Sequence, residues 1–187
     1  MLVSDVHTTA PARTAVDVAR WADSSEIADA LSVADAVLHR GDATRPEIEA
    51  LVDRFRRWPG NEQARWIIQR VDSRAESPLE SYSRLMFERQ SLPAPETQVE
   101  IHDPSGRVVA RVDFLWRGMS TIGEADGRLK YTIGAAIYQE KRREDRLRDL
   151  GLEVVRWDFA DVRHSPRATA DRIRAAFRRA QRRLLAR

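Results

Sequence analysis

One pattern of alternating apolar residues limits the folds open to this chain more than any other feature. Residues 97–103, TQVEIHD, alternate polar and apolar side chains, and residues 108–116, VVARVDFLW, form a second such run after the segment PSGR. A period of two is typical of a half-buried strand, and a short Pro- and Gly-containing segment between two strands indicates a turn. The two runs therefore predict a β-hairpin. Two shorter apolar runs, at 120–127 and 152–159, predict a third and a fourth strand.

The remaining segments have helical spacing. Residues 14–72 carry Ala, Val and Leu at three- and four-residue intervals, and Thr44, followed by Pro46 and Glu47, is typical of a capped helix start. Further helices are expected at 77–90, 138–151 and 166–187. The order of helix, three strands, helix, strand and helix predicts an α/β fold with a mixed sheet flanked by helices. We expect two parts: an N-terminal helical unit, residues 1–73, and a domain of αβββαβ order, residues 74–187.

The composition excludes several classes of site. The chain has no cysteine, which excludes disulfides, thiolate nucleophiles and Cys-type metal sites, and its four histidines lie far apart in the sequence. No apolar run approaches the roughly 20 residues of a membrane span, and the first residues lack the pattern of a signal peptide. The sequence therefore predicts a cytoplasmic protein without a membrane partner.

Positive charge is concentrated at the C-terminal end. Residues 166–187 hold eight Arg and one Asp, a net charge of +7, whereas the whole chain carries only +3. Such a segment is a candidate for binding nucleic-acid phosphates, and the same pattern would equally suit a solvated helix whose apolar face packs through Ile173, Ala176, Phe177, Ala180 and Leu184. The candidate DNA contacts are Arg172, Arg174, Arg178, Arg179, Arg182 and Arg183.

Three carboxylates interrupt the second and third predicted strands. Asp113 lies within the apolar run 108–116, and Glu124 and Asp126 end the run that begins at residue 120. Adjacent strands would bring Asp113 and Glu124 close together, and their mutual repulsion would be relieved by a divalent cation. Mg²⁺, or Mn²⁺ in its place, suits such an oxygen site, since no histidine cluster favours zinc. For each acidic residue alone, an exposed strand position or a polar turn is an ordinary alternative.

These residues resemble a known superfamily. An aspartate, about ten residues, and then a glutamate on the adjoining strand, within the order αβββαβ, are similar to the PD-(D/E)xK restriction-endonuclease-like superfamily. The segments SPLES, GRVVARVDFLW, GEADGRLKY and EKRREDRLRDLGLEVVRW resemble its very-short-patch-repair-like branch, in particular the C-terminal domain of AbiEi-type antitoxin proteins. The resemblance covers at least residues 74–161, and residues 11–38 are similar to the helical middle part of those proteins.

The resemblance implies a role for each acidic position. It implies that Glu80, in the helix of SPLES, is the first acidic residue of the site, that Asp113 is the metal-binding aspartate and that Glu124 is the second metal ligand. The superfamily carries a lysine two residues after that glutamate, and this chain carries Asp126 there, as a further candidate ligand. The cation that stabilises the developing charge must then come from Lys130 or from Lys141 on the following helix.

Two functions from different classes follow from the resemblance. In the first, the protein is a Mg²⁺-dependent endonuclease that hydrolyses phosphodiester bonds of DNA, with Asp113, Glu124, Lys130 and Lys141 as catalytic candidates. In the second, it is a non-catalytic antitoxin-type transcriptional regulator that uses a degenerate nuclease fold to contact DNA, a cognate toxin or another protein.

Overall fold

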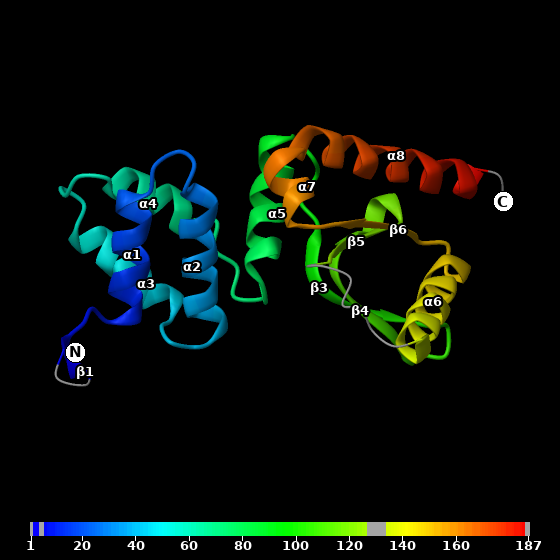
Figure 1. Ribbon diagram of the computed structural model, residues 1–187, viewed down its shortest axis with the longest axis horizontal. Coiled ribbons are helices and arrows are strands. Elements are labelled where there is room, and N and C mark those ends of the chain that lie inside the picture. Colours follow the sequence, from blue (N-terminus) through cyan, green and yellow to red (C-terminus); the bar gives the residue numbers. More distant parts are fainter. Residues whose placement is uncertain (1, 4–5, 127–133, 186–187) are drawn as a thin grey trace. The chain divides into compact units, whose positions relative to one another are not determined.

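The structure, a computed structural model, describes residues 2–3, 6–126 and 134–185. The chain is α/β, with a four-stranded mixed sheet flanked by helices, which confirms the predicted class (Figure 1). It divides into two compact units, Met1–Tyr82 and Ser83–Arg187. This division falls inside a helix, whereas the change in sequence character that we used lies at residues 73–74.

The first unit is built from helices, apart from a short antiparallel pair of strands, β1 (Leu2–Val3) and β2 (Val6–His7), that the sequence analysis missed. Its core is made of small and aliphatic residues, among them Val16, Leu31 and Ile67, which are nearly inaccessible. Thr44 and Glu47 form a reciprocal capping box, as predicted. The four helices are α1 (Pro11–Trp21), α2 (Ile27–His39), α3 (Arg45–Arg54) and α4 (Asn61–Ile68).

The helix α5 (Pro78–Arg89) spans the division between the units. In its first turn, the Ser81 hydroxyl donates to the buried Asp35 carboxylate of α2 at 2.6 Å, and Asp35 also accepts the backbone N–H of Asp72 at 2.7 Å. These bonds satisfy a carboxylate that would otherwise be costly to bury. They tie the start of α5 to the first unit.

The sheet of the second unit has the order β3-β4-β5-β6. The strands are β3 (Glu96–His102), β4 (Val108–Trp116), β5 (Thr121–Ala125) and β6 (Glu153–Trp157). β3, β4 and β5 are antiparallel neighbours, and β6 pairs with β5 in parallel, so the chain must cross over between β5 and β6. The helix α6 (Gly134–Asp149) lies in that crossover.

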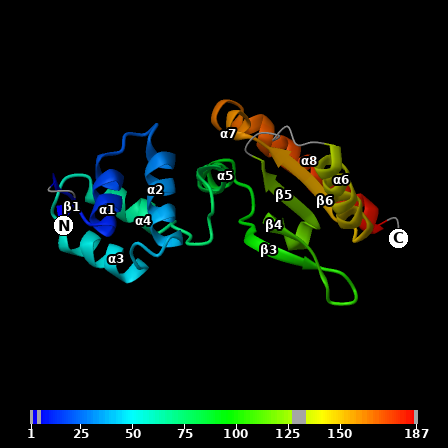
Figure 2. The ribbon, with the colours of Figure 1, turned by 60° about the horizontal axis from the view of Figure 1, so that its bottom comes forward.

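Helices cover both faces of this sheet (Figures 1 and 2). Leu147 of α6 packs in a core cluster with Leu115 of β4 and Ile122 of β5. On the other face lie α8 (Pro166–Leu185) and the second half of α5; a short helix that we did not predict, α7 (Phe159–His164), leads into α8. The apolar stripe of α8 is buried at Ile173, Ala176 and Ala180, as its spacing predicts, whereas Leu184 is 55% exposed, so its predicted packing was wrong.

An aromatic cluster fills the space between the sheet and helices α5 and α8. Phe87 of α5 contacts Phe114, Trp116 and Trp157 with ring centroids 5.1, 5.1 and 5.6 Å away, and Trp116 contacts Phe177 of α8 at 5.3 Å. Trp116 and Trp157 are 3% and 2% exposed and therefore belong to the core. Such a cluster buries much apolar surface on one face of β4, whereas the opposite face carries both the apolar Leu115 and the polar Asp113.

None of the described helices is long and apolar enough to cross a membrane.

Candidate functional site

Asp113 and Glu124 face each other across β4 and β5. The two strands pair Phe114 with Gly123 and Leu115 with Ile122, and the same register places Asp113 opposite Glu124. Because side chains alternate along a strand, both carboxylates lie on the face of Leu115 and Ile122, which is the face covered by α6. Directly opposite residues on one face are the closest neighbours in a sheet. The predicted convergence of these two carboxylates is therefore present in the fold.

Both oxygens of Asp113 are held by hydrogen bonds. The backbone N–H of Ala125, next to Glu124, donates to Asp113 Oδ2 at 2.8 Å. The side-chain amide of Gln98, on the neighbouring strand β3, donates to Asp113 Oδ1 at 3.4 Å. A carboxylate bonded from two strands is fixed in orientation before any ligand arrives.

Glu124 is paired with an arginine of α6. Arg143 Nη2 donates to Glu124 Oε1 at 2.7 Å and to the backbone carbonyl of Arg111 at 3.2 Å. Only 13% of the Glu124 side chain and 25% of the Arg143 side chain are exposed. Burial raises the pKa of Glu124 to about 7; the negative charge of Asp113 adds to this increase, and Arg143 and Arg156 reduce it. The arginine therefore offsets only part of the cost of burying two neighbouring carboxylates.

The residues around Arg143 form a second, more exposed charge network. Glu144 pairs with Arg156 of β6 at 2.5 Å and also with Arg148 one turn further along α6. Its pKa is lowered, mainly by the hydrogen bond from Arg156. The positive charge of Arg156 is thus shared between Glu144 and, at longer range, Glu124.

Glu80 has a local role at the start of α5. Its carboxylate accepts the Ser77 hydroxyl at 2.8 Å and the backbone N–H of Glu76 at 3.2 Å, which is the bonding of a helix cap. Glu80 is 5% exposed and belongs to the first unit, while Asp113 and Glu124 belong to the second. Its predicted role as the first acidic residue of the site stays a prediction.

The other predicted site residues do not join the carboxylate pair in the described structure. Asp126 is exposed, and its backbone N–H donates to the carbonyl of Trp157 at 2.9 Å. Lys141 is on α6 with an exposed side chain. Lys130 lies outside the described residues. The α6 cation that reaches Glu124 is Arg143, which sequence reasoning missed.

A signal for Arg143 was present in the helical spacing. Arg143 precedes the buried Leu147 by four residues, so both belong to the stripe of α6 that packs on the sheet. Lys141 is two residues from Arg143 and is therefore turned to a different side of the helix. Gln98, which contacts Asp113, was missed because a lone glutamine in a strand carries no motif.

The donor atoms of the pair fit a hard divalent cation. Mg²⁺ is commonly held by one or two carboxylates together with water and phosphate oxygens, and Asp113 and Glu124 supply two such groups. A bound cation would favour the ionised form of Glu124, whose pKa is raised mainly by burial and further by the charge of Asp113. Among the side chains that the structure describes, no group of three or more His, Asp or Glu residues could hold a metal ion. Within the described residues, the pair itself supplies two carboxylate ligands.

Most of the predicted DNA-binding arginines of α8 are engaged in ion pairs. Arg172 pairs with Asp161 at 2.9 Å and Arg174 pairs with Asp171 at 2.9 Å. Arg178 and Arg182 are exposed side chains of the same helix.

Arg179 and Arg183 both pair with the buried Glu153, at 3.0 and 2.7 Å. The Arg179 contact is also a hydrogen bond. The Arg183 contact, made to Glu153 Oε1, is an ion pair alone, since its geometry is not that of a hydrogen bond. Glu153, together with Asp161 and Asp171, reduces the net positive charge that α8 presents to a phosphate backbone.

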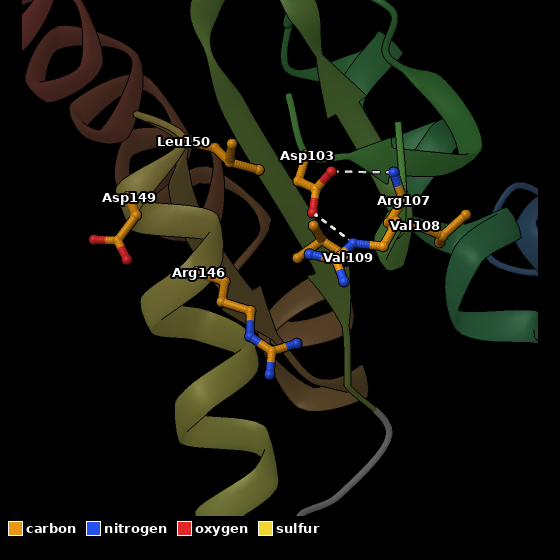
Figure 3. Close-up of a pocket in the computed structure, with 7 residues that line it drawn as sticks. All are labelled: Asp103, Arg107, Val108, Val109, Arg146, Asp149 and Leu150. Atoms are coloured by element: carbon orange, nitrogen blue, oxygen red, sulfur yellow. Dashed lines mark hydrogen bonds and ion pairs between the residues drawn. The ribbon is translucent and has the colours of Figure 1, made fainter. Parts of the chain in front are cut away.

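A separate cavity of about 550 Å³ opens between the β3–β4 turn and the end of α6 (Figure 3). Asp103 accepts the backbone N–H of Arg107 at 3.1 Å, and its pKa is lowered, mainly by the Ser105 hydroxyl. The cavity is lined by two arginines, two aspartates and three aliphatic residues, so the charges of its lining balance. The seven residues are Asp103, Arg107, Val108, Val109, Arg146, Asp149 and Leu150.

Comparison with known proteins yields two similar uncharacterized proteins of Mycobacterium tuberculosis, one from strain CDC 1551 and one from strain H37Rv. Each is 37% identical to this chain over 171 residues, which cover 91% of this chain and 62% of the relative. The chain therefore spans less than two thirds of the length of the curated relatives it matches. No family model matches the chain, and no solved structure matches it.

Proposed function

We propose that the chain is a metal-dependent endonuclease-like protein of the PD-(D/E)xK type that hydrolyses phosphodiester bonds of DNA at the Asp113–Glu124 pair. The observation that carries this proposal is the juxtaposition of two partly buried carboxylates on adjacent antiparallel strands, beside an arginine of the next helix. The element order supports it as well, because three antiparallel strands, a helix and a parallel fourth strand follow α5.

In this proposal each residue of the chain has a defined task. Asp113 and Glu124 would hold Mg²⁺ or Mn²⁺, which when bound supplies Lewis-acid stabilisation of the phosphate and a more acidic water. Ala125 N–H and Gln98 keep the Asp113 carboxylate in one orientation. Arg143 takes the task that the superfamily gives to its lysine: its guanidinium is fixed by Glu124 and the Arg111 carbonyl, where it can stabilise charge that develops on phosphate oxygens.

Nicking of supercoiled plasmid by the pure protein tests the proposal. We expect Mg²⁺- or Mn²⁺-dependent cleavage that is lost in Asp113→Asn and Glu124→Gln, since each removes a charged ligand without changing side-chain shape. Arg143→Ala should slow cleavage by about 10²–10³-fold, the usual loss for one charge-stabilising donor. Glu96→Gln, which alters an exposed carboxylate of β3 that pairs with Arg117, is the matched control and should cut like the parent.

The arginines of α8 give a test of DNA contact that is independent of cleavage. If Arg178 and Arg182 contact phosphates, binding to a duplex of arbitrary sequence should weaken as salt rises, with a slope that falls by roughly 1 to 2 when both become Gln. Unchanged binding in this double variant would remove α8 from the proposed interface.

A non-catalytic function is the second candidate, and the Arg143–Glu124 ion pair favours it. A guanidinium 2.7 Å from Glu124 already supplies positive charge where a metal ion would, and Asp126 replaces the lysine of the superfamily pattern. A scaffold of the antitoxin type, which contacts DNA, a toxin or another protein, requires a stable fold and no bound metal ion. Intact supercoiled, linear and single-stranded DNA after incubation with either metal would reject the nuclease proposal and leave the scaffold in its place.

A further inference from the structure

We propose that Gln98 is a positioning residue for the Asp113–Glu124 pair, held in place by a left-handed backbone within β3. Its role in phosphodiester cleavage rests on the proposed function, whereas its contact with Asp113 does not. Neither the superfamily pattern nor the sequence spacing assigns Gln98 a task.

The backbone of Gln98 is the first evidence. Its φ is +53°, a conformation that residues with a Cβ rarely adopt and that costs free energy unless the surroundings impose it. Ser91 and Ser120 also have a positive φ, but both lie in turns after helical segments, where such a conformation is common. Among the described non-glycine residues, Gln98 alone has a positive φ within a strand.

The strand register shows what this conformation achieves. β3 pairs Thr97 with Phe114 and Val99 with Val112, so Gln98 lies between two regular pairs and opposite Asp113. The pairs on either side of Gln98 keep one register, and the register shift that this ladder does contain lies further along β3, between Ile101 and His102. The amide nitrogen of Gln98 reaches Asp113 Oδ1 at 3.4 Å.

The consequence is a carboxylate bonded from both flanking strands. Asp113 receives Ala125 N–H from β5 on Oδ2 and the Gln98 amide from β3 on Oδ1. A half-buried acidic group next to Glu124 would otherwise turn to relieve the repulsion between the two charges. Backbone strain that persists beside a charged pair is typical of pre-organised functional sites.

Three variants separate this proposal from a merely structural role. Gln98→Gly removes the amide and also the cost of the positive φ, and Gln98→Met removes the amide while keeping the length of the side chain. Ser91→Gly is the matched control, because it relieves the same φ of 53° without a link to Asp113. Thermal unfolding and Mn²⁺-dependent nicking are measured for all three.

We expect Gln98→Gly to melt no lower than the parent and yet to cut at least roughly tenfold more slowly, since a hydrogen bond to a charged group is lost. Gln98→Met should slow cleavage to a similar degree, and Ser91→Gly should cut like the parent. A residue with a purely structural role would lose stability and activity together. Parent-like cleavage by both Gln98 variants, or a marked loss of stability in Gln98→Gly, would overturn the proposal.

An NMR measurement tests the contact between Gln98 and Asp113 even if the parent protein does not cut DNA. The side-chain amide signals of Gln98, assigned by their absence in Gln98→Met, should shift clearly in Asp113→Ala and stay in place in Glu96→Ala, a change two residues away on the same strand. Absent cleavage in the parent would reject the proposed function alone. If the Gln98 amide signals keep their chemical shifts in Asp113→Ala, the positioning role is rejected.

Discussion

Replacing Glu124 by Gln should remove a pH dependence of stability that the buried carboxylate creates. Burial raises the pKa of Glu124 from 4.5 to about 7, so the folded protein binds a proton more tightly there than the unfolded chain does. Stability from this group is fully present below pH 4.5 and is lost as the pH rises through 7. The difference between the two pKa values corresponds to about 3 kcal/mol, of which about 2.5 kcal/mol falls between pH 5 and 8.

The measurement is the free energy of unfolding in urea at several pH values from 5 to 8, for the parent and for Glu124→Gln. Glutamine imitates the protonated acid, so the stability of the variant relative to the parent should rise by about 2.5 kcal/mol across this range. Ionisable groups that are common to both proteins cancel in the difference. Any constant effect of the altered Arg143 contact also leaves the slope unchanged.

Glu144→Gln is the matched control for this experiment. Its carboxylate lies on the same helix as Arg143, but its pKa is lowered, mainly by the hydrogen bond from Arg156. Its contribution is therefore present above pH 4.5 and is lost only as the pH falls below that value. The Glu144→Gln difference should be flat between pH 5 and 8, and an equally flat Glu124→Gln difference would refute the argument that burial governs this site.

Two further predictions concern the two faces of the sheet. Arg143→Ala should lower the free energy of unfolding by about 2–3 kcal/mol at pH 8, because Glu124 loses the positive charge that is paired with it. The loss should be clearly smaller at pH 5, where Glu124 is protonated. Equal losses at both pH values in chemical denaturation would contradict this. Gly123→Ala should lower stability by about 1–3 kcal/mol, because a Cβ would lie 2.4 Å from a ring carbon of Trp157. A Cβ at Gly118 would have no atom within 4 Å, so Gly118→Ala should melt like the parent. Equal melting temperatures for both alanine variants would show that the aromatic side chains rearrange at little cost.

The local chemistry of the sequence was enough to determine the main helices and the four strands of the sheet, together with the placement of the carboxylate pair; β1, β2 and α7 escaped it. Alternation identified the hairpin, and helical spacing identified α5, α6 and the buried stripe of α8, because these periods depend only on residues close together in the chain. Asp113 and Glu124 could be assigned to neighbouring strands because a hairpin-like connection of few residues leaves little freedom of register. The other residues of the site, Arg143 and Gln98, could not be predicted from local sequence pattern.

Tertiary packing alone decided the partners of those carboxylates. Arg143 reaches Glu124 because Leu147, one turn away, is buried against the sheet and sets the rotation of α6; the exposed Lys141 offered the same charge on the wrong side. Gln98 meets Asp113 through a left-handed conformation that no propensity favours. Glu153 pairs with two arginines of α8 that the sequence presented as free positive charge. In each case the interacting groups are distant in sequence, so their contact depends on how helices pack on the sheet and not on local pattern.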